Sequence, residues 1–514
     1  MSRLNRGSIF IERDEKEDEI SKSKIDRFIF LVFLVALTLI PIVIGAKAIL
    51  FVSPLISGTG VTGTGYQLDF FTYFKFVILV MLTIVAFLLF LYKLYFLNYK
   101  VKWNFVSWSI IVFLFALVLS AFFAEHKSIA LWGIYNRHDG AITFICYAIL
   151  MFIALNITYP QNALKKLVYT LYPFVWINVI ISLLNLYGVN ILQKSFFQKI
   201  FTLFLIDDMT INETSVLTGT LNQWNYMSGY SAVMAIVFLT LAVFHGSVKS
   251  KLVNLFTAIA AFLTILASIS TSGFITLLFM SLLVLVLIFI KANKKQSLIW
   301  FASFIIFAII STGVLSKHNP QVWTESVGFF TNTNPFVQEE SFSGLYFPVN
   351  KVGATDSKLE LPTLTERYWS AGSGRIYIWE NTISLIMEKP LTGYGLDTLT
   401  YHFPQNDINK RSGMYYENIL IDKPHNLYLS ILYGTGLLGL LSFMSFISIY
   451  TCRLVKYVIK DTNLPVIWAF TLGFGAFLLQ ALLNDSVIGG SIVPFLATSI
   501  ILVISNSKVE EEIL

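Results

Sequence analysis

Apolar runs long enough to cross a lipid bilayer recur along almost the whole of this sequence. A helix needs roughly 20 apolar residues to span the hydrocarbon core, where each backbone N–H and C=O must find a hydrogen-bond partner within the protein. Charged residues make up only 13% of the chain, whereas a soluble domain carries about 25%. The sequence therefore predicts an all-α integral membrane protein that crosses the bilayer many times.

The length rule predicts about twelve transmembrane helices. We expect them near residues 28–50, 70–96, 105–124, 141–158, 167–187, 226–245, 252–270, 273–290, 297–316, 426–450, 464–483 and 491–505. The resulting division is a cytoplasmic tail (1–27), nine spans (28–316), one large extracytoplasmic loop with short helices (317–425), three spans (426–505) and a C-terminal tail (506–514). The N-terminal tail mixes acidic and basic residues, lacks the apolar core of a signal peptide, and is expected to be disordered.

Basic residues in the short loops set the orientation, because lysine and arginine concentrate in cytoplasmic loops. Thirteen lie in the loops on one side, against four on the other, which are Lys127, Arg137, Lys194 and Lys199. This asymmetry predicts that both termini are cytoplasmic and that 317–425 lies outside the cytoplasm. Such a long polar segment indicates work done at the membrane surface.

Several classes of function find no support in the sequence. Cys146 and Cys452 offer neither a disulfide framework nor a metal-ligand spacing. No glycine-rich phosphate loop and no aspartate-rich cluster is present, and a net charge of +6 is too modest for a nucleic-acid partner. We therefore expect no cofactor and no metal. Lys75 lies near the outer end of its span, where a lysine can snorkel, so no charge is expected in mid-membrane and an ion-coupled transporter is disfavoured.

Arg375 begins a predicted amphipathic helix in the polar segment. The apolar residues of that helix recur at helical spacing, Ser373 and Gly374 precede it as capping residues, and Pro390 follows its end. A helix N-terminus presents free N–H groups, and guanidinium grips phosphate oxygens in a bidentate way, so this corner suits a phosphate group. The alternative is a surface arginine paired with an acid such as Glu380.

His425 opens a predicted span at its outer end. The positive end of a helix disfavours added positive charge, which favours the neutral imidazole. A neutral histidine at this boundary suits a general base acting on a sugar hydroxyl. The alternative is an interfacial residue that anchors the span. His402 lies in the polar segment without a surrounding pattern, and His126 and His318 are expected in loops.

Arg137 lies in a loop rich in aromatic residues that begins at Trp132. A cation beside aromatic rings fits sugar stacking combined with a phosphate contact. The same composition fits a belt of aromatic residues at the membrane interface. Four aromatic residues of the polar segment leave the same two alternatives open, namely Tyr368, Trp369, Tyr415 and Tyr416.

Five stretches of this sequence resemble the O-antigen ligase and O-antigen polymerase family of bacterial membrane glycosyltransferases. They are 131–140, 219–226, 373–375 with Trp379, 390–395, and His425-Asn426 running into 433–439. The last three are the most specific, and they come in the order and approximate spacing of the family.

This resemblance implies a metal-independent glycosyltransferase of the bacterial cytoplasmic membrane. Its donor would be a polyprenyl-diphosphate-linked glycan on the outer face of the membrane, and its acceptor a hydroxyl of a glycan, lipid or protein. The resemblance implies that Arg375 binds the diphosphate and that His425 assists acceptor attack. The same motifs contribute expected substrate-binding residues, namely Trp132, Arg137, Asn225, Tyr394 and Asn426.

The sequence departs from the family in one clear place. Gly273, in the stretch 270–274, stands where the family often has a second phosphate-binding arginine. Either Arg137 or another cation takes that role, or the donor is held less tightly. Trp224 replaces a proline, which is a milder change.

The sequence leaves the precise reaction open among a polymerase, a ligase and a protein O-glycosyltransferase. Its richness in Ile, Lys, Asn and Phe suggests an AT-rich genome and a Gram-positive host, which favours the polymerase. A flippase of lipid-linked glycans would also have about twelve spans, and a scaffold of an assembly complex is a third possibility. The large one-sided loop and the lack of an internal repeat disfavour the flippase.

Overall fold

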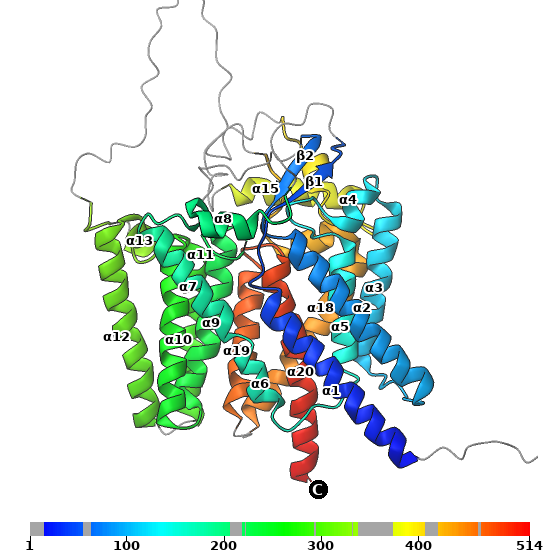
Figure 1. Cartoon of the computed structure of the whole chain (residues 1–514). Helices are drawn as coiled ribbons and strands as arrows, with labels where there is room; N and C mark the ends of the chain where they lie inside the picture. Colours follow the sequence, from blue (N-terminus) through cyan, green and yellow to red (C-terminus); the bar gives the residue numbers. More distant parts are fainter. Residues whose placement is uncertain are drawn as a thin grey trace, which may run out of the picture.

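The computed structural model describes residues 15–54, 63–205, 218–221, 223–291, 294–331, 333–337, 374–406, 420–460 and 464–513. Long helices packed side by side dominate it (Figure 1). Nine helices within the described ranges are long and apolar enough to cross a membrane. They are α2 (Tyr73–Phe96), α3 (Phe105–Phe123), α6 (Ala163–Tyr169) with α7 (Tyr172–Leu186), α9 (Trp224–Phe244), α10 (Val248–Ala267), α11 (Thr271–Lys291), α12 (Lys294–His318), α18 (Leu427–Ile459) and α20 (Ile488–Ile513).

These nine helices confirm the prediction of a helical, multi-pass membrane protein. Helices also occupy the other three predicted spans, as α1 (Glu15–Leu39), α5 (Ala141–Ala154) and α19 (Pro465–Gln480). At 1.5 Å per residue, the 14 residues of α5 cover about 21 Å, less than the roughly 30 Å of a hydrocarbon core. The count of twelve spans therefore stays a prediction.

The predicted first span, 28–50, is wrong in its second half. Helix α1 ends at Leu39, two residues before Pro41, which cannot continue the hydrogen bonding of a helix. The chain then forms strand β1 (Lys47–Phe51), which pairs antiparallel with β2 (Gly65–Asp69). The apolar residues of β1 thus belong to a hairpin rather than to a membrane helix.

The expected disorder of the N-terminal tail is wrong for residues 15–27, because α1 begins at Glu15. Asp26, within that helix, is buried, and its carboxylate accepts a hydrogen bond of 2.7 Å from Nζ of Lys93 on α2. A buried charge needs such a partner, so this ion pair fixes α1 against α2.

Lys75 does not snorkel, contrary to the expectation from its position. Its side chain is 1% exposed, and its Nζ donates to the backbone oxygens of Val43, Phe71 and Thr220 at 2.6, 2.9 and 2.8 Å. Together with the pair of Asp26 and Lys93, it shows that charges are buried among these helices. The sequence argument against a transporter, which assumed that none were, is correspondingly weaker.

A cap of short elements covers one end of the helical bundle (Figure 1). It contains the hairpin, α4 (Lys127–Trp132), α8 (Ser195–Phe201), α13 (Gln321–Thr324) and α15 (Arg375–Glu388). The start of α1 and the end of α20 lie at the opposite end. Two further short helices of the polar segment are α14 (Gly328–Thr331) and α16 (Leu399–His402). Residues predicted from the sequence but outside the described ranges are Asn222, Tyr368, Trp369, Ser373, Tyr415 and Tyr416.

The motifs at 390–395 and 433–439 pack directly against each other. Tyr394 and Gly395 donate their backbone N–H groups to the carbonyl oxygens of Tyr433 and Gly434, at 2.9 and 3.0 Å. Helix α18 is kinked at Gly436, whose φ is +66°, and a Cβ there would lie 2.2 Å from the backbone oxygen of Leu391. Only glycine fits such a conformation and such a close approach. The kink therefore receives the 390–395 segment and ties the cap to a membrane helix.

Replacing Gly436 by alanine should lower the thermal unfolding midpoint of the protein in detergent. The left-handed conformation alone costs a side chain roughly 1–2 kcal/mol, and the clash with Leu391 adds to it. Gly313 of α12 is the matched control, because nothing lies within 4 Å of a Cβ there. Gly313→Ala should be neutral or stabilising by up to about 1 kcal/mol. Equal midpoints for the two variants would contradict this account of the kink.

Candidate active site

The backbone of His425 is held in a conformation that residues other than glycine rarely adopt. Its φ is +52°, and His138 (+49°) and Asp397 (+61°) share this left-handed region. Such residues cost of order 1–3 kcal/mol each and persist where the surrounding contacts fix them, often at functional sites. All three lie in the polar segments that meet near α15 and the start of α18, where the contacts described below converge.

His425 forms a pair with Asp485, which lies between α19 and α20. Nδ1 of the ring is 3.0 Å from Oδ2 of the carboxylate. Asp485 also accepts from the backbone N–H of Asn426 at 3.2 Å and from the Ser430 hydroxyl at 2.9 Å. Burial works to raise the pKa of Asp485, but the bond and charge of His425, together with Lys423, lower it to about 2. Asp485 is therefore a carboxylate at neutral pH.

The ionised state of Asp485 determines which ring nitrogen of His425 carries the proton. A carboxylate can only accept hydrogen bonds, so Nδ1 must be the protonated nitrogen, and Nε2 of the neutral ring keeps its lone pair. The side chain of His425 is 31% exposed, so the ring can be reached from outside. This arrangement suits a general base whose orientation is fixed by a buried acid.

Asp485 also changes the acidity expected for His425. Burial and the nearby Arg375 work to lower the pKa of the imidazole, but the hydrogen bond and charge of Asp485 raise it above its ordinary value. The position at a helix N-terminus predicted the opposite tendency from the sequence. The carboxylate of Asp485 was not part of that prediction, and with it the pKa of His425 is raised.

Arg375 is the first residue of α15 and follows Gly374, whose φ is +81°. Burial lowers the pKa of its guanidinium, although the charge of Asp485 opposes this shift. The charge of Arg375 in turn works to lower the pKa of His425. The start of α15 lies beside His425, because Nε1 of Trp379, one turn after Arg375, donates to the backbone oxygen of Pro424 at 2.7 Å. The guanidinium forms no ion pair with a residue that the structure describes, so the expected alternative partner Glu380 does not hold it. Arg375 is half-buried and available to an anion.

Arg137, in contrast, is already bound to two carboxylates. Its guanidinium lies 3.0 Å from Asp397 and forms an ion pair with Asp422, and its side chain is only 8% exposed. Burial works to lower its pKa, but the two acids hold it above the ordinary value. The structure thus places Arg137 as a link between three segments of the chain rather than as an open phosphate ligand.

A second buried ion pair runs beside the first. Nζ of Lys423 donates to Oδ2 of Asp139 at 2.7 Å, and both side chains are about nine-tenths buried. Burial raises the pKa of Asp139 to about 6 although Lys423 opposes it. Burial works to lower the pKa of Lys423, but Asp139 holds it above the ordinary value. The two ion pairs fasten the segment that immediately precedes His425.

The other predicted substrate-binding residues fall into two groups. Asn426 caps α18, because its side chain accepts from the backbone N–H groups of Tyr428 and Leu429. Tyr394 stacks on Tyr433 and its hydroxyl donates to Glu388 at 2.6 Å. Both residues therefore have structural contacts that account for their presence.

Asn225 and Trp132 are more open. Asn225 is the second residue of α9, and its side-chain oxygen accepts from the Ser270 hydroxyl at 2.7 Å. Its backbone oxygen accepts from the side chain of Asn484, the neighbour of Asp485, at 3.4 Å. Trp132 is 52% exposed and lies on the wall of a groove of about 720 Å³, together with Phe76 and the hairpin. Asn225 is thus close to the His425 site, whereas Trp132 faces a separate groove.

The structure explains the glycine at position 273. Helix α11 packs so closely on α9 that a Cβ on Gly273 would lie 2.2 Å from the Ser228 hydroxyl and 2.4 Å from its backbone oxygen. No arginine fits there without moving one of the two helices. The departure from the family is therefore coupled to this helix packing.

Sequence reasoning missed the acids of the site and the lysine that precedes His425. A signal for one of them was present, because Asp485 lies in a short polar interruption between two apolar helices. Lys423 stands two residues before His425. Their partners come from distant parts of the chain, and no spacing rule predicts such contacts.

Comparison with known proteins identifies part of the chain. Residues 256–444 match the model of the O-antigen ligase family. This stretch of the chain is similar to an O-antigen ligase domain. The resemblance found in the sequence is thereby confirmed, and the matched stretch contains Arg375, Tyr394, His425 and Asn426. Asp485 and Arg137 lie outside its limits.

One curated relative comes from Rickettsia conorii and bears the name "Putative polysaccharide ligase". The two sequences are 21% identical over 271 residues, which cover 47% of this chain and 63% of the relative. The match thus spans less than two thirds of that protein.

Replacing Asp139 by asparagine should destabilise the protein by roughly 3–5 kcal/mol, because it leaves Lys423 as an unpaired buried charge. Removing that charge as well, in Asp139→Asn with Lys423→Met, should restore part of the loss. Glu19→Gln is the control, since Glu19 pairs with Lys22 at 2.8 Å but is 73% exposed, and such surface pairs contribute little. Thermal unfolding in detergent measures all three variants. A change in Asp139→Asn no larger than that in the control would contradict the role assigned to this ion pair.

Proposed function

We propose that this protein is a membrane glycosyltransferase. It transfers a polyprenyl-diphosphate-linked glycan to an acceptor hydroxyl at the outer face of the bacterial cytoplasmic membrane. The observation that carries the proposal is the pair of His425 and Asp485 beside Arg375, a base and a cation close together within reach of solvent. The match to the O-antigen ligase family supports the same class of reaction.

The reaction is a displacement at the anomeric carbon of the donor. The acceptor oxygen forms a bond to that carbon as the bond from the carbon to the diphosphate oxygen breaks, with its electron pair leaving on the diphosphate. The acceptor proton passes to Nε2 of His425, the nitrogen that keeps a lone pair. Donor and acceptor thus exchange one bond for another, and no oxidant or nucleotide is needed.

Arg375 stabilises the charge that develops on the leaving group. Its place at the start of α15 adds the free N–H groups and partial positive charge of a helix N-terminus to its own guanidinium. A diphosphate gains negative charge as it departs, so this interaction strengthens toward the transition state. Asp485 is a positioning residue that keeps the ring of His425 in the productive tautomer and stabilises the imidazolium that forms. No metal is assigned to the transfer.

The acceptor decides among the three activities considered from the sequence. The names of the family and of the Rickettsia relative favour a ligase that joins a finished polysaccharide to another molecule. The composition of the chain favours a polymerase that joins repeat units. Both use the same base, the same cation and the same leaving group, and they differ in which hydroxyl is presented to His425.

A flippase of lipid-linked glycans is the second candidate, because of the buried charges of Lys75 and of the pair of Lys93 and Asp26. Ionisable residues among membrane helices often mark transport pathways. Each of these charges is satisfied by hydrogen bonds in the structure, which also fits a purely structural role.

His425→Ala should abolish the long surface glycan of cells that carry only this variant, with a loss of transfer rate of roughly 10²–10⁴-fold. Gel analysis of the glycan and extraction of polyprenyl-linked intermediates measure the effect. The control is His245→Ala, because His245 ends α9 at the end opposite Asn225.

The intermediates distinguish the activities. Single lipid-linked units outside the membrane indicate a polymerase, and finished polymer on its lipid carrier indicates a ligase. Units held inside would indicate the flippase and refute the proposal, as would a normal glycan made by His425→Ala present at normal levels.

The transfer rate should fall at acidic pH, because His425 must be neutral to accept a proton. Asp485 holds the pKa of His425 above its ordinary value, so the decline should already begin above pH ~6.5. Asp485→Asn removes the charge that raises this pKa, so the decline should move to lower pH while the maximal rate decreases. Initial rates of the purified protein across pH test both points. A decline at the same pH in both proteins would exclude His425 as the titrating base.

A further inference from the structure

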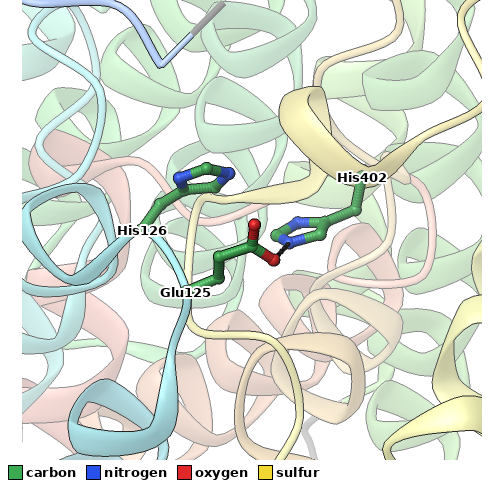
Figure 2. Close-up of side chains that lie close together, drawn as sticks. All are labelled: Glu125, His126 and His402. Carbon is green, nitrogen blue, oxygen red and sulfur yellow. Dashed lines mark ion pairs between the residues drawn. The ribbon is translucent and has the colours of Figure 1, made fainter.

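Three potential metal ligands outside the His425 site converge on one point (Figure 2). Glu125 and His126 lie at the junction of α3 and α4, and His402 is the last residue of α16. One ligand atom from each lies within 4.8 Å of the other two. The residues come from parts of the chain that are far apart in sequence, which explains why no spacing motif predicted the group.

His402 is already oriented as a ligand. Its Nδ1 lies 3.1 Å from the backbone oxygen of Thr398 and 2.9 Å from the Tyr433 hydroxyl. A carbonyl oxygen only accepts, so the contact with Thr398 places the proton on Nδ1 and leaves a lone pair on Nε2. Metal-binding histidines typically donate their other ring N–H in this way to a carbonyl or carboxylate oxygen.

The lone pair of His402 faces a negative charge. Its side chain is only 10% exposed, and Nε2 has no hydrogen-bond partner among the residues that the structure describes. The nearest charged atom is Oε2 of Glu125, at 3.6 Å. A lone pair and a carboxylate oxygen repel each other unless a proton or a metal cation lies between them, and 3.6 Å is too long for a hydrogen bond. The third side chain, His126, brings a second imidazole to the same place, with ring centroids 5.3 Å apart.

We propose that Glu125, His126 and His402 bind a divalent transition-metal ion, and specifically zinc. Two imidazole nitrogens and one carboxylate oxygen are a ligand set that zinc uses, with water in the fourth position. Hard cations such as Mg²⁺ prefer oxygen ligands and disfavour this set. Zinc bonds of about 2.0–2.1 Å give a tetrahedral edge of roughly 3.3 Å. The separation of 3.6 Å is close to that edge, and the exposed carboxylate of Glu125 can close the rest.

The ion would fasten the polar segment to the membrane helices. Glu125 and His126 directly follow α3, whereas His402 belongs to the segment that carries Asp397. The Tyr433 hydroxyl of α18 contacts Nδ1 of His402, the nitrogen that faces away from the proposed ion. The site is therefore structural. It lies outside the glycosyl transfer proposed above and does not depend on it, so zinc content and transfer activity are separate measurements.

The first test is the zinc content of the full-length protein, purified in detergent with a tag that contains no histidine. Mass spectrometry of the metal should give about one zinc ion per chain. Glu125→Gln and His126→Gln should each lower the zinc affinity by more than the roughly 10–100-fold that loss of a hydrogen-bond partner of a metal ligand causes. Glu125 is 66% exposed, and neither side chain takes part in the hydrogen bonds of His402 to Thr398 and Tyr433. These variants should therefore fold. His318→Gln is the matched control and should keep its zinc.

The second test is thermal unfolding with and without EDTA. The chelator should lower the midpoint of the wild type, ZnCl₂ should restore it, and MgCl₂ should not. Glu125→Gln and His126→Gln should show no response to the chelator. Equal zinc contents in the wild type and both variants would overturn the proposal. So would a wild-type midpoint that ignores EDTA and zinc, which would leave only an ion pair between Glu125 and His402.

Discussion

Buried charges need partners, and two such partnerships, formed between loop segments, hold the candidate site together. Arg137 joins Asp397 to Asp422, and Lys423 joins Asp139 to the same region. Arg137, Asp397, Lys423 and Asp139 are each at most 8% exposed, so any of these charges without its partner would be strongly unfavourable. The segment before His425 is thus fixed from both sides, and the strained backbone of His425 is maintained by contacts that come from three parts of the chain.

The same requirement explains the division of roles among the arginines. Arg137 lies among carboxylates and is used entirely within the protein, whereas Arg375 has no described ion-pair partner and lies beside His425. The two arginines expected from the sequence to contact phosphate therefore differ in what they can still bind. Asp485, like Arg137, is held by contacts within the protein, because its carboxylate oxygens accept hydrogen bonds from His425, Asn426 and Ser430. It therefore acts on a substrate only through His425.

How far the sequence could predict this molecule depends on the range of the interaction. Helices such as α9 and α12 follow from local apolar runs, and they were predicted within a few residues. Strand β1 was predicted as part of a membrane helix, because a short apolar run is compatible with either a strand or a helix. Only its pairing with β2 shows that it is a strand. Arg375 and His425 stood out through their local motifs. Asp485 and Lys423 did not, because their importance arises from contacts across the fold, and Gly273 became interpretable only once α11 was seen packed on α9.

The position of Asp485 has a consequence for how the protein is made. The carboxylate that orients His425 lies near the C-terminal end of the chain, after α19, whereas Asp139 and Arg137 are synthesised much earlier. During insertion into the membrane, these early charges must wait for Asp397, Asp422 and Lys423 to emerge before they are neutralised. The base itself is completed only when α19 has entered the bilayer. A chain that stops short of that helix would contain the whole stretch 256–444 that matches the family and would still lack the carboxylate that orients His425.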